Sequence, residues 1–373
     1  MAYFIIFIIS SCLVGLAEAS LRKKFLIPIT ICLLIAAAVI LSVFGAIRAD
    51  SVGTDTATYN RYFMVAVNSA NFQSFHYDFK HIDQSEFGFT VLNYVVSRFT
   101  SSPNGFEFIC GLVINLNVVH AIFLMRKRIS MTIAWLTFCC MFYGTSIDIL
   151  RQSIALSFVL LAVAYMFNNM DWRAACMILL AISLHTSAII SVLIFFTGFL
   201  FQRVKNVKGR LFVNVMVVVV TCILPILIQL ISYFGLYTDK YNGYLSQGGQ
   251  FSLLATILVR LPMLLMVLWS FIVCRKHLNR MTGWIYVLLI QESLMIPLYL
   301  ISPVVGRLML YFGITKVIGY PLALANSGIR FRVIKGFMYL VYVLMIVGIF
   351  YNQIIVNNNG EVFPYVVNSN FLN

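Results

Sequence analysis

A small set of ionisable side chains lies within or beside long apolar runs of this sequence, where charge is costly and usually functional. The set comprises Arg48, Asp50, Asp148, Arg151, His185, Arg260, Glu292, Arg307 and Lys316. Arginine is the preferred partner of phosphate, because its planar guanidinium donates two parallel charge-assisted hydrogen bonds. Arg151, Arg260 and Arg307 come from three separate apolar runs and outnumber their acidic neighbours. They therefore predict a site for an anionic group such as a lipid-linked diphosphate.

Simpler interpretations of these charges remain open at the level of sequence. Asp148 and Arg151 are three residues apart and could pair with each other on one helix. Glu292 and Lys316 are predicted to form a structural ion pair between neighbouring helices. Arg48 could extend its charged end to the membrane interface. A single histidine in an apolar helix is often a packing residue, but Ser183, Thr186 and Ser187 surround His185 and favour a functional role.

The composition places these charges in a membrane. Of 373 residues, 61% are hydrophobic and 10% are charged, whereas soluble domains are roughly 45–50% apolar and about 25% charged. The mean hydropathy is +0.95. These values exclude a soluble enzyme and predict an all-α polytopic membrane protein with a single domain over residues 1–373. The net charge of +14 lies mainly in short loops, so we expect no nucleic-acid partner.

The spacing of apolar runs predicts about ten transmembrane helices and one re-entrant helical hairpin. Six short loops carry most of the basic residues, and such loops face the cytoplasm. Residues 174–201 lie between two of these loops, so they must cross the membrane an even number of times. At 28 residues they are too short for two full spans. A re-entrant hairpin with His185 near its apex satisfies both conditions; one tilted span with a polar kink is the alternative.

Two segments are predicted on the outer face. Residues 48–103 contain two candidate amphipathic helices, one from Thr54, the expected N-cap, to about Val67, and one that starts at Glu86. The polar residues of the second helix form one stripe, made of Glu86, Thr90, Asn93 and Ser97. Both helices could lie on the membrane surface and cover a cavity. Residues 234–250, rich in Tyr, Gly and Gln, form the second outer loop.

Several short motifs resemble the EpsG-like branch of the Wzy-type polysaccharide polymerases. They are R-x(4)-G-T-D-x(3)-Y at Arg48–Tyr59, E-x-G-F at Glu86–Phe89, Leu150-Arg151-Gln152, His185-Thr186-Ser187-Ala188, Arg307 with Tyr311-Phe312, and Val362-Phe363-Pro364-Tyr365. Each motif is weak alone, but together they occur in the family's order over nearly the whole chain. The resemblance implies a fold related to multi-spanning lipid-sugar glycosyltransferases.

The resemblance also implies an activity and a location. Such enzymes join oligosaccharide repeat units carried on undecaprenyl diphosphate into O-antigen or exopolysaccharide, at the periplasmic face of the bacterial inner membrane. The expected partners are the lipid-linked glycan donor and acceptor, membrane lipid, a chain-length regulator and a flippase. A lipid-glycan ligase, a flippase or transporter and a membrane O-acyltransferase are the alternatives. We find no internal repeat of the kind that transporters carry.

The chemistry of glycosyl transfer assigns roles to particular residues. It requires a base for the acceptor hydroxyl and stabilisation of the departing diphosphate. The candidate catalytic residues are His185, Glu86 and Asp55, and imidazole suits the role of base because it titrates near neutral pH. The candidate diphosphate ligands are Arg151, Arg260, Arg307 and Arg48, and the candidate glycan contacts are Tyr59, Gln152 and Tyr311. Asp50 and Asp55 do not form a D-x-D metal motif, so we expect no metal and no cofactor.

Overall fold

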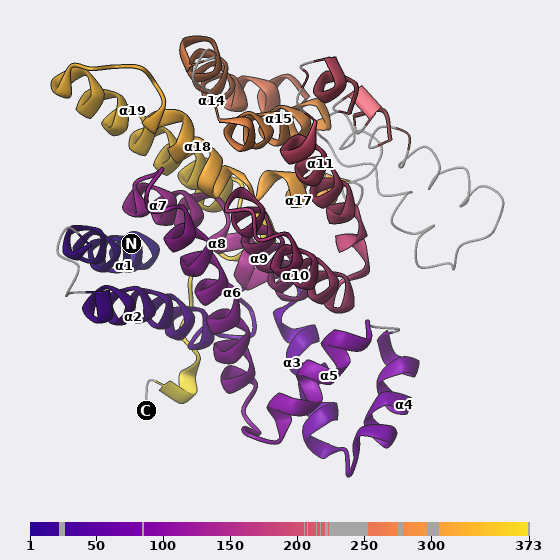
Figure 1. Cartoon of the computed structure of the whole chain (residues 1–373). Helices are drawn as coiled ribbons and strands as arrows, with labels where there is room; N and C mark the ends of the chain where they lie inside the picture. The colour runs from indigo at the N-terminus through magenta and orange to yellow at the C-terminus, as the bar shows by residue number, and fades with distance from the viewer. Residues whose placement is uncertain are drawn as a thin grey trace.

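The computed structural model describes residues 1–21, 27–83, 86–204, 206, 208–213, 215–216, 218–220, 223, 253–274, 279–296 and 306–371. Figure 1 shows these residues as packed helices, with α3, α4 and α5 grouped beside one end of α9 and α10. Within the described ranges there is no β-strand, and one isolated bridge joins Arg48 to Val367. The predicted second outer loop, 234–250, lies outside the described residues.

The helices follow the predicted apolar runs closely. They are α1 Ala2–Ser20, α2 Ile27–Ala46, α3 Thr56–Asn68, α4 Phe72–Asp83, α5 Phe87–Ser97, α6 Pro103–Met125, α7 Met131–Met141, α8 Tyr143–Asp148, α9 Leu150–Phe167, α10 Asp171–Leu184, α11 Ser191–Arg203, α14 Leu253–Cys274, α15 Arg280–Leu294, α17 Met309–Gly313, α18 Lys316–Ala325 and α19 Arg332–Phe350. The 3₁₀ helix η2, Thr186–Ile190, joins α10 to α11.

Seven segments among the described residues are long and apolar enough to cross a membrane. They are α1, α2, α6, α9, Thr186–Arg203, Ile257–Cys274 and Arg332–Val356. This confirms the predicted all-α polytopic membrane protein. Several further apolar helices are shorter, and residues 211–233, an apolar run of the sequence that is one of the predicted crossings, lie largely outside the described residues. The total of about ten crossings therefore stays a prediction.

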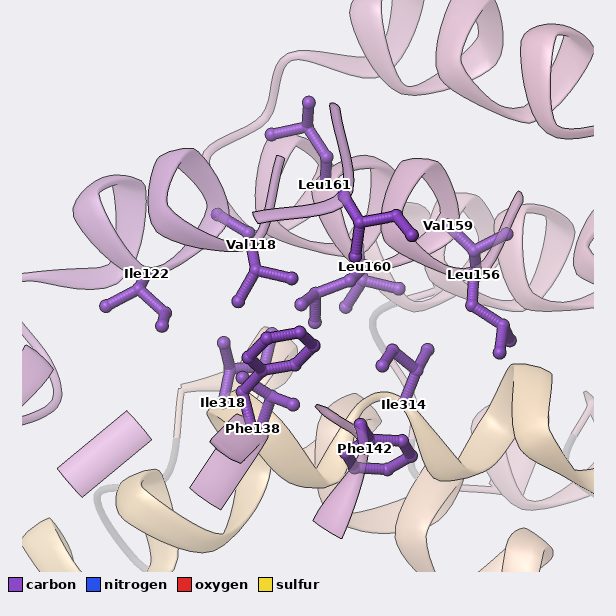
Figure 2. Packing of buried hydrophobic residues seen from close by; sticks show 14 of the residues in the cluster. Val118, Ile122, Phe138, Phe142, Leu156, Val159, Leu160, Leu161, Ile314 and Ile318 are labelled. Atoms are coloured by element: carbon purple, nitrogen blue, oxygen red, sulfur yellow. The ribbon is translucent and has the colours of Figure 1, made fainter. Parts of the chain in front are cut away.

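Helix α9 occupies the centre of the fold, and 89% of its residues are buried inside the protein. Figure 2 shows its Leu156 and Leu160 packed opposite Phe138 of α7 and Ile314, with Val118 of α6 beside them. Lipid-facing helices have a different pattern: α1 and α19 leave many large aliphatic side chains exposed. Because α9 is surrounded by protein, its first residues, including Arg151, are held firmly at one end of the bundle.

Residues 48–103, the predicted outer segment, form three helices rather than the two expected. Helices α3 and α5 match the predicted pair, and α4 was not predicted. Asp55, not Thr54, is the N-cap of α3, and it makes no side-chain capping bond. In the polar stripe of α5, Thr90 and Asn93 are buried, while Phe87 is 63% exposed. The polar face thus packs onto protein, and an apolar face is left outward, as a helix on a membrane surface requires.

Helices α10 and α11 form a helical hairpin that returns to its starting end. At that end the Gln202 Nε2 donates to Asp171 Oδ1 at 2.9 Å, and Arg203 lies 3.8 Å from Asp171. Arg280 also donates to the backbone of Gln202, so basic residues gather here. With 14 and 13 residues, each helix spans only about 20 Å. The chain thus turns back on itself within 174–201; that this segment is re-entrant and crosses the membrane an even number of times stays a prediction.

The C-terminal segment folds back onto the end of α2. Ala49 N donates to Val366 O at 2.9 Å, and Asn368 N donates to Ile47 O at 2.8 Å. The Tyr3 hydroxyl donates to Val362 O at 2.7 Å, so both termini lie at one end of the bundle. The Tyr365 ring stacks on Phe44. The V-F-P-Y motif near the end of the chain therefore packs beside Arg48, where the R-x(4)-G-T-D-x(3)-Y motif begins.

Candidate active site

Glu86 lies at the centre of a cluster drawn from three distant parts of the chain. Its Oε1 is 2.9 Å from His185 Nδ1 and accepts hydrogen bonds from the backbone N–H of Thr186, at 2.9 Å, and from the Thr186 hydroxyl, at 3.1 Å. Its Oε2 forms an ion pair with Arg151 Nη1 at 3.1 Å. The side chains of Glu86, His185 and Arg151 are 16–21% exposed. The sequence-based candidates Glu86, His185 and Arg151 are thus in direct contact.

The polar elements of this cluster depend on a break in the hairpin and on a glycine. The backbone of His185 is extended, with φ −155° and ψ 118°, and ends α10 before η2 begins. The freed N–H of Thr186 therefore points to Glu86 instead of joining the helix. Gly88 lets the start of α5 approach this break, because a Cβ at Gly88 would lie 2.6 Å from the carbonyl oxygen of Ser183. The glycine of the E-x-G-F motif is thereby explained.

We expect Gly88→Ala to separate Glu86 from His185 without removing either side chain. The new methyl group meets backbone atoms of Ser183, which cannot rotate away, so the start of α5 must shift. The polymer formation that the sequence motifs predict should fall at least tenfold while the protein still inserts. A Gly336→Ala variant is the control, since nothing lies within 4 Å of a Cβ there. Equal polymer from both variants would show that the close approach is unimportant.

The environment of Glu86 keeps its carboxyl ionised. Burial by itself raises the pKa of Glu86, but the hydrogen bond from His185, the charge of Arg151 and the Thr186 N–H lower it to about 2, from an ordinary 4.5. The stabilisation from these contacts is therefore complete above pH 4.5 and is lost as the pH falls towards 2. An ionised Glu86 is a poor base and a good hydrogen-bond acceptor, so it orients His185 by accepting a hydrogen bond from Nδ1–H.

The predicted glycan contacts surround the cluster but are buried. Tyr59 is 7% exposed and packs edge-on against Phe89. The Tyr311 hydroxyl lies 2.9 Å from Ser187 Oγ, and Gln152 donates to the Arg307 carbonyl at 3.1 Å. Tyr59, Tyr311 and Gln152 thus pack against residues of the cluster or their neighbours. Their contact with a glycan stays a prediction.

Asp55 belongs to a neighbouring loop contact. The Asp148 carboxyl lies near the backbone N–H groups of Thr54 and Asp55 and near Arg307, all of which favour its ionised form. Ile149, with φ −91° and ψ 66°, separates α8 from α9. Because this break rotates Arg151 away from the helix that carries Asp148, their three-residue spacing does not follow the helical rule. Asp148 anchors the G-T-D loop, and Arg151 binds Glu86.

Arg48 lies outside the cluster, in a buried structural network. It forms an ion pair with Glu107 at 2.9 Å, and both side chains are 2% exposed. Its remaining donors bind the carbonyl oxygens of Gly45, Val52 and Ile147 and the hydroxyl of Thr56. These hydrogen bonds use four of the five guanidinium donors, and the ion pair with Glu107 holds the same group. The structure thus gives Arg48 a structural role, joining α2, the following loop, α6 and α8, and its contact with a diphosphate stays a prediction.

The other two predicted arginines differ in position. Arg260 lies 3.3 Å from Glu292 Oε1, which also binds Lys316 at 2.7 Å. The expected Glu292–Lys316 ion pair is present, and Arg260 extends it to a triad between α14, α15 and α18. Arg307 is exposed. Its carbonyl oxygen accepts a hydrogen bond from Gln152, the residue that follows Arg151. Arg307 is therefore better placed than Arg260 to approach a ligand at the cluster.

Sequence reasoning missed two contributors. Glu107, the partner of Arg48, is a carboxylate one turn into the apolar run 104–125, and its position within that run was the available signal. Phe89 carries the Arg151 guanidinium 5.6 Å above its ring, a cation–π contact that stabilises the arginine. Among the described residues, no group of three or more His, Cys, Asp or Glu could hold a metal ion.

The fold and the cluster together define a polytopic helical membrane protein with a carboxylate, an imidazole and a guanidinium at one end of its helices. Comparison with protein-family models gives a match to the EpsG family over residues 31–367. The chain belongs to the EpsG family, as its motifs predicted, and this membership indicates a polymerase role in polysaccharide synthesis. No curated protein and no solved structure matches the chain.

Proposed function

We propose that the protein is a glycosyltransferase that joins oligosaccharide repeat units carried on undecaprenyl diphosphate, at the periplasmic face of the inner membrane. The observation that carries this proposal is the contact of Glu86 with both His185 and Arg151. It combines a base, a group that orients the base, and a cation for an anionic leaving group. These are the parts that transfer from a glycosyl diphosphate requires.

His185 acts as the general base in this proposal. Glu86 accepts a hydrogen bond from Nδ1–H, which leaves the unprotonated Nε2 able to take the proton from the acceptor hydroxyl as its oxygen attacks the anomeric carbon of the donor. The new glycosidic C–O bond forms while the bond from that carbon to the diphosphate oxygen breaks. The diphosphate leaves with the bonding electron pair. Glu86 also stabilises the imidazolium that results.

Positive charge beside this base supports departure of the diphosphate. Arg151 lies against Glu86, and the exposed Arg307 lies next along the same rim through Gln152. Fixed cations at the point where negative charge develops are commonly the largest contribution to such catalysis. Arg260 lies in the separate triad with Glu292 and Lys316. It remains a proposed contact for the lipid diphosphate.

The distribution of basic residues supports the outer location. Arg203 and Arg280 gather where the hairpin begins and ends, and basic residues mark the cytoplasmic side. The cluster lies at the opposite end of α10, beside its last residue. We therefore place the reaction on the periplasmic side, where a flippase would deliver lipid-linked units and a chain-length regulator could contact the enzyme.

Gene deletion and complementation test this function. Loss of the gene should reduce the surface glycan from a ladder to a single capping unit, and the wild-type gene should restore the ladder. Arg151→Lys and Arg307→Lys keep the charge but lose the planar fork, so each should reduce polymer strongly. Arg128→Lys, in a basic loop, is the matched control.

The same experiment separates the alternatives. A ligase mutant would accumulate long lipid-linked polymer, and a transporter mutant would lose even the single unit at the surface. Full ladders from both arginine variants, with normal protein in the membrane, would contradict a diphosphate site at this cluster.

A further inference from the structure

A groove of about 770 Å³ lies in the outer segment, away from the residues of the Glu86 cluster. Residues of α3 and α4 line it, together with Asp50 before α3 and Pro103 at the start of α6. This volume falls within the range of sites that bind organic ligands. The side chains that line the groove are mainly short polar groups and aliphatic groups, so its chemistry differs from that of the arginine-bearing cluster.

Helix α3 lies between the groove and the cluster: one of its faces lines the groove, and another packs towards the cluster. Ala57, Arg61, Met64 and Asn68 recur at intervals of four, three and four residues, are exposed, and line the groove. Tyr59 lies on another face of the same helix and packs against Phe89, which carries Arg151. A ligand in the groove therefore lies across one helix from the reacting groups.

A buried amide in the groove has an unused acceptor. Asn60 is 5% exposed, and its Nδ2 donates to Asp50 Oδ1 at 2.9 Å. Its Oδ1 is buried and has no hydrogen-bond partner in the part of the chain that the structure describes. Buried amide oxygens are normally satisfied. A hydroxyl donor from a ligand in the groove would supply the missing bond.

The charges along the groove indicate the class of ligand. Asp50 and Asp78 contribute two carboxylates and Arg61 one guanidinium, so a diphosphate is disfavoured. Carboxylates and amides accept hydrogen bonds from hydroxyl groups, and Met64 offers an apolar surface for C–H groups. We propose that this groove is a saccharide-binding site that holds the growing glycan chain while its reducing end reacts at the cluster. The assignment of the growing chain rests on the proposed function.

Fragment binding to the purified protein tests this site directly. The probe is the host's own polysaccharide, partially hydrolysed with acid to oligosaccharides, titrated against full-length protein in lipid nanodiscs. Ala57→Trp fills the groove from α3 and should weaken binding at least tenfold. Asn68→Ala removes a groove amide with little risk to folding and should weaken it about threefold. Gln73→Trp, an exposed position on α4 that does not line the groove, is the matched control and should bind normally.

The distribution of chain lengths provides a second measurement. Ala57→Trp should shorten the ladder while the first linkages still form, because the cluster is intact. His185→Ala should lose the ladder but bind fragments normally. If both groove variants bind fragments as the wild type does, the groove assignment is wrong whatever the activity. If groove variants lose binding while His185→Ala keeps a full ladder, the saccharide site stands and the assignment of His185 as the general base is wrong.

Discussion

His185→Ala is expected to abolish the polymer ladder while the protein remains inserted in the membrane. Loss of a general base lowers the rate by about 10²–10⁴-fold, and a ladder requires many successive transfers. The alanine variant removes the imidazole but keeps the extended backbone that ends α10. Quantitative immunoblotting of membranes, together with gel analysis of surface glycan, measures inserted protein and polymer in the same cells.

Glu86→Gln provides the comparison that assigns the roles. Glutamine retains an oxygen that accepts from His185 and Thr186 but loses the charge that pairs with Arg151. Because the pKa of Glu86 is lowered to about 2, the carboxylate is a weak base near neutral pH. We therefore expect residual polymer from this variant and less from His185→Ala.

The pH dependence of purified enzyme tests the same assignment. Turnover should decrease as the pH is lowered through a single ionisation, and His185→Ala should lack that ionisation. Glu86 stays ionised above about pH 4.5, so it contributes no step to the profile near neutrality. An inactive Glu86→Gln together with an active His185→Ala would reverse the two roles.

Arg48→Ala is expected to prevent accumulation of the folded protein. The variant leaves Glu107, 3% exposed, as a buried charge without its partner, a change that typically costs 3–5 kcal/mol. It also removes donors from the Gly45, Val52 and Ile147 carbonyl oxygens. The amount of inserted protein and its thermal unfolding in detergent measure the effect.

Two further variants show whether the cost arises from the unpaired carboxylate. Arg48→Ala combined with Glu107→Gln removes the uncompensated charge and should recover part of the lost stability. Arg128→Ala, an exposed arginine, should unfold as the wild type does. If Arg48→Ala accumulates and melts normally, the buried pair does not stabilise the fold, and Arg48 returns as a candidate ligand.

Local patterns accounted for much of the candidate site. The break at His185 followed from polar residues inside an apolar run, and the E-x-G-F motif selected Glu86. The stripe of Glu86, Thr90 and Asn93 correctly marked one helix face. Yet that face packs inward: Glu86 bonds to His185 and Thr186 of the neighbouring hairpin, which no single helix reveals, while Thr90 and Asn93 donate to backbone carbonyls one turn earlier.

The sequence by itself determined the class of protein and the small set of residues that could do chemistry. Apolar runs of membrane length leave few places for charge, so most of the buried ionisable residues stand out without a structure, Glu107 being the one that was missed. Its motifs also identified the EpsG family.

Only the tertiary structure decided which charges meet. Arg151 pairs with Glu86 and Arg48 with Glu107, although each arginine had an acidic residue much closer in sequence. The break at Ile149 redirects Arg151, and the packing of α2 on α6 places Arg48 beside Glu107. Ion pairing depends on distance in space, and within a bundle that distance is set by how helices end and pack.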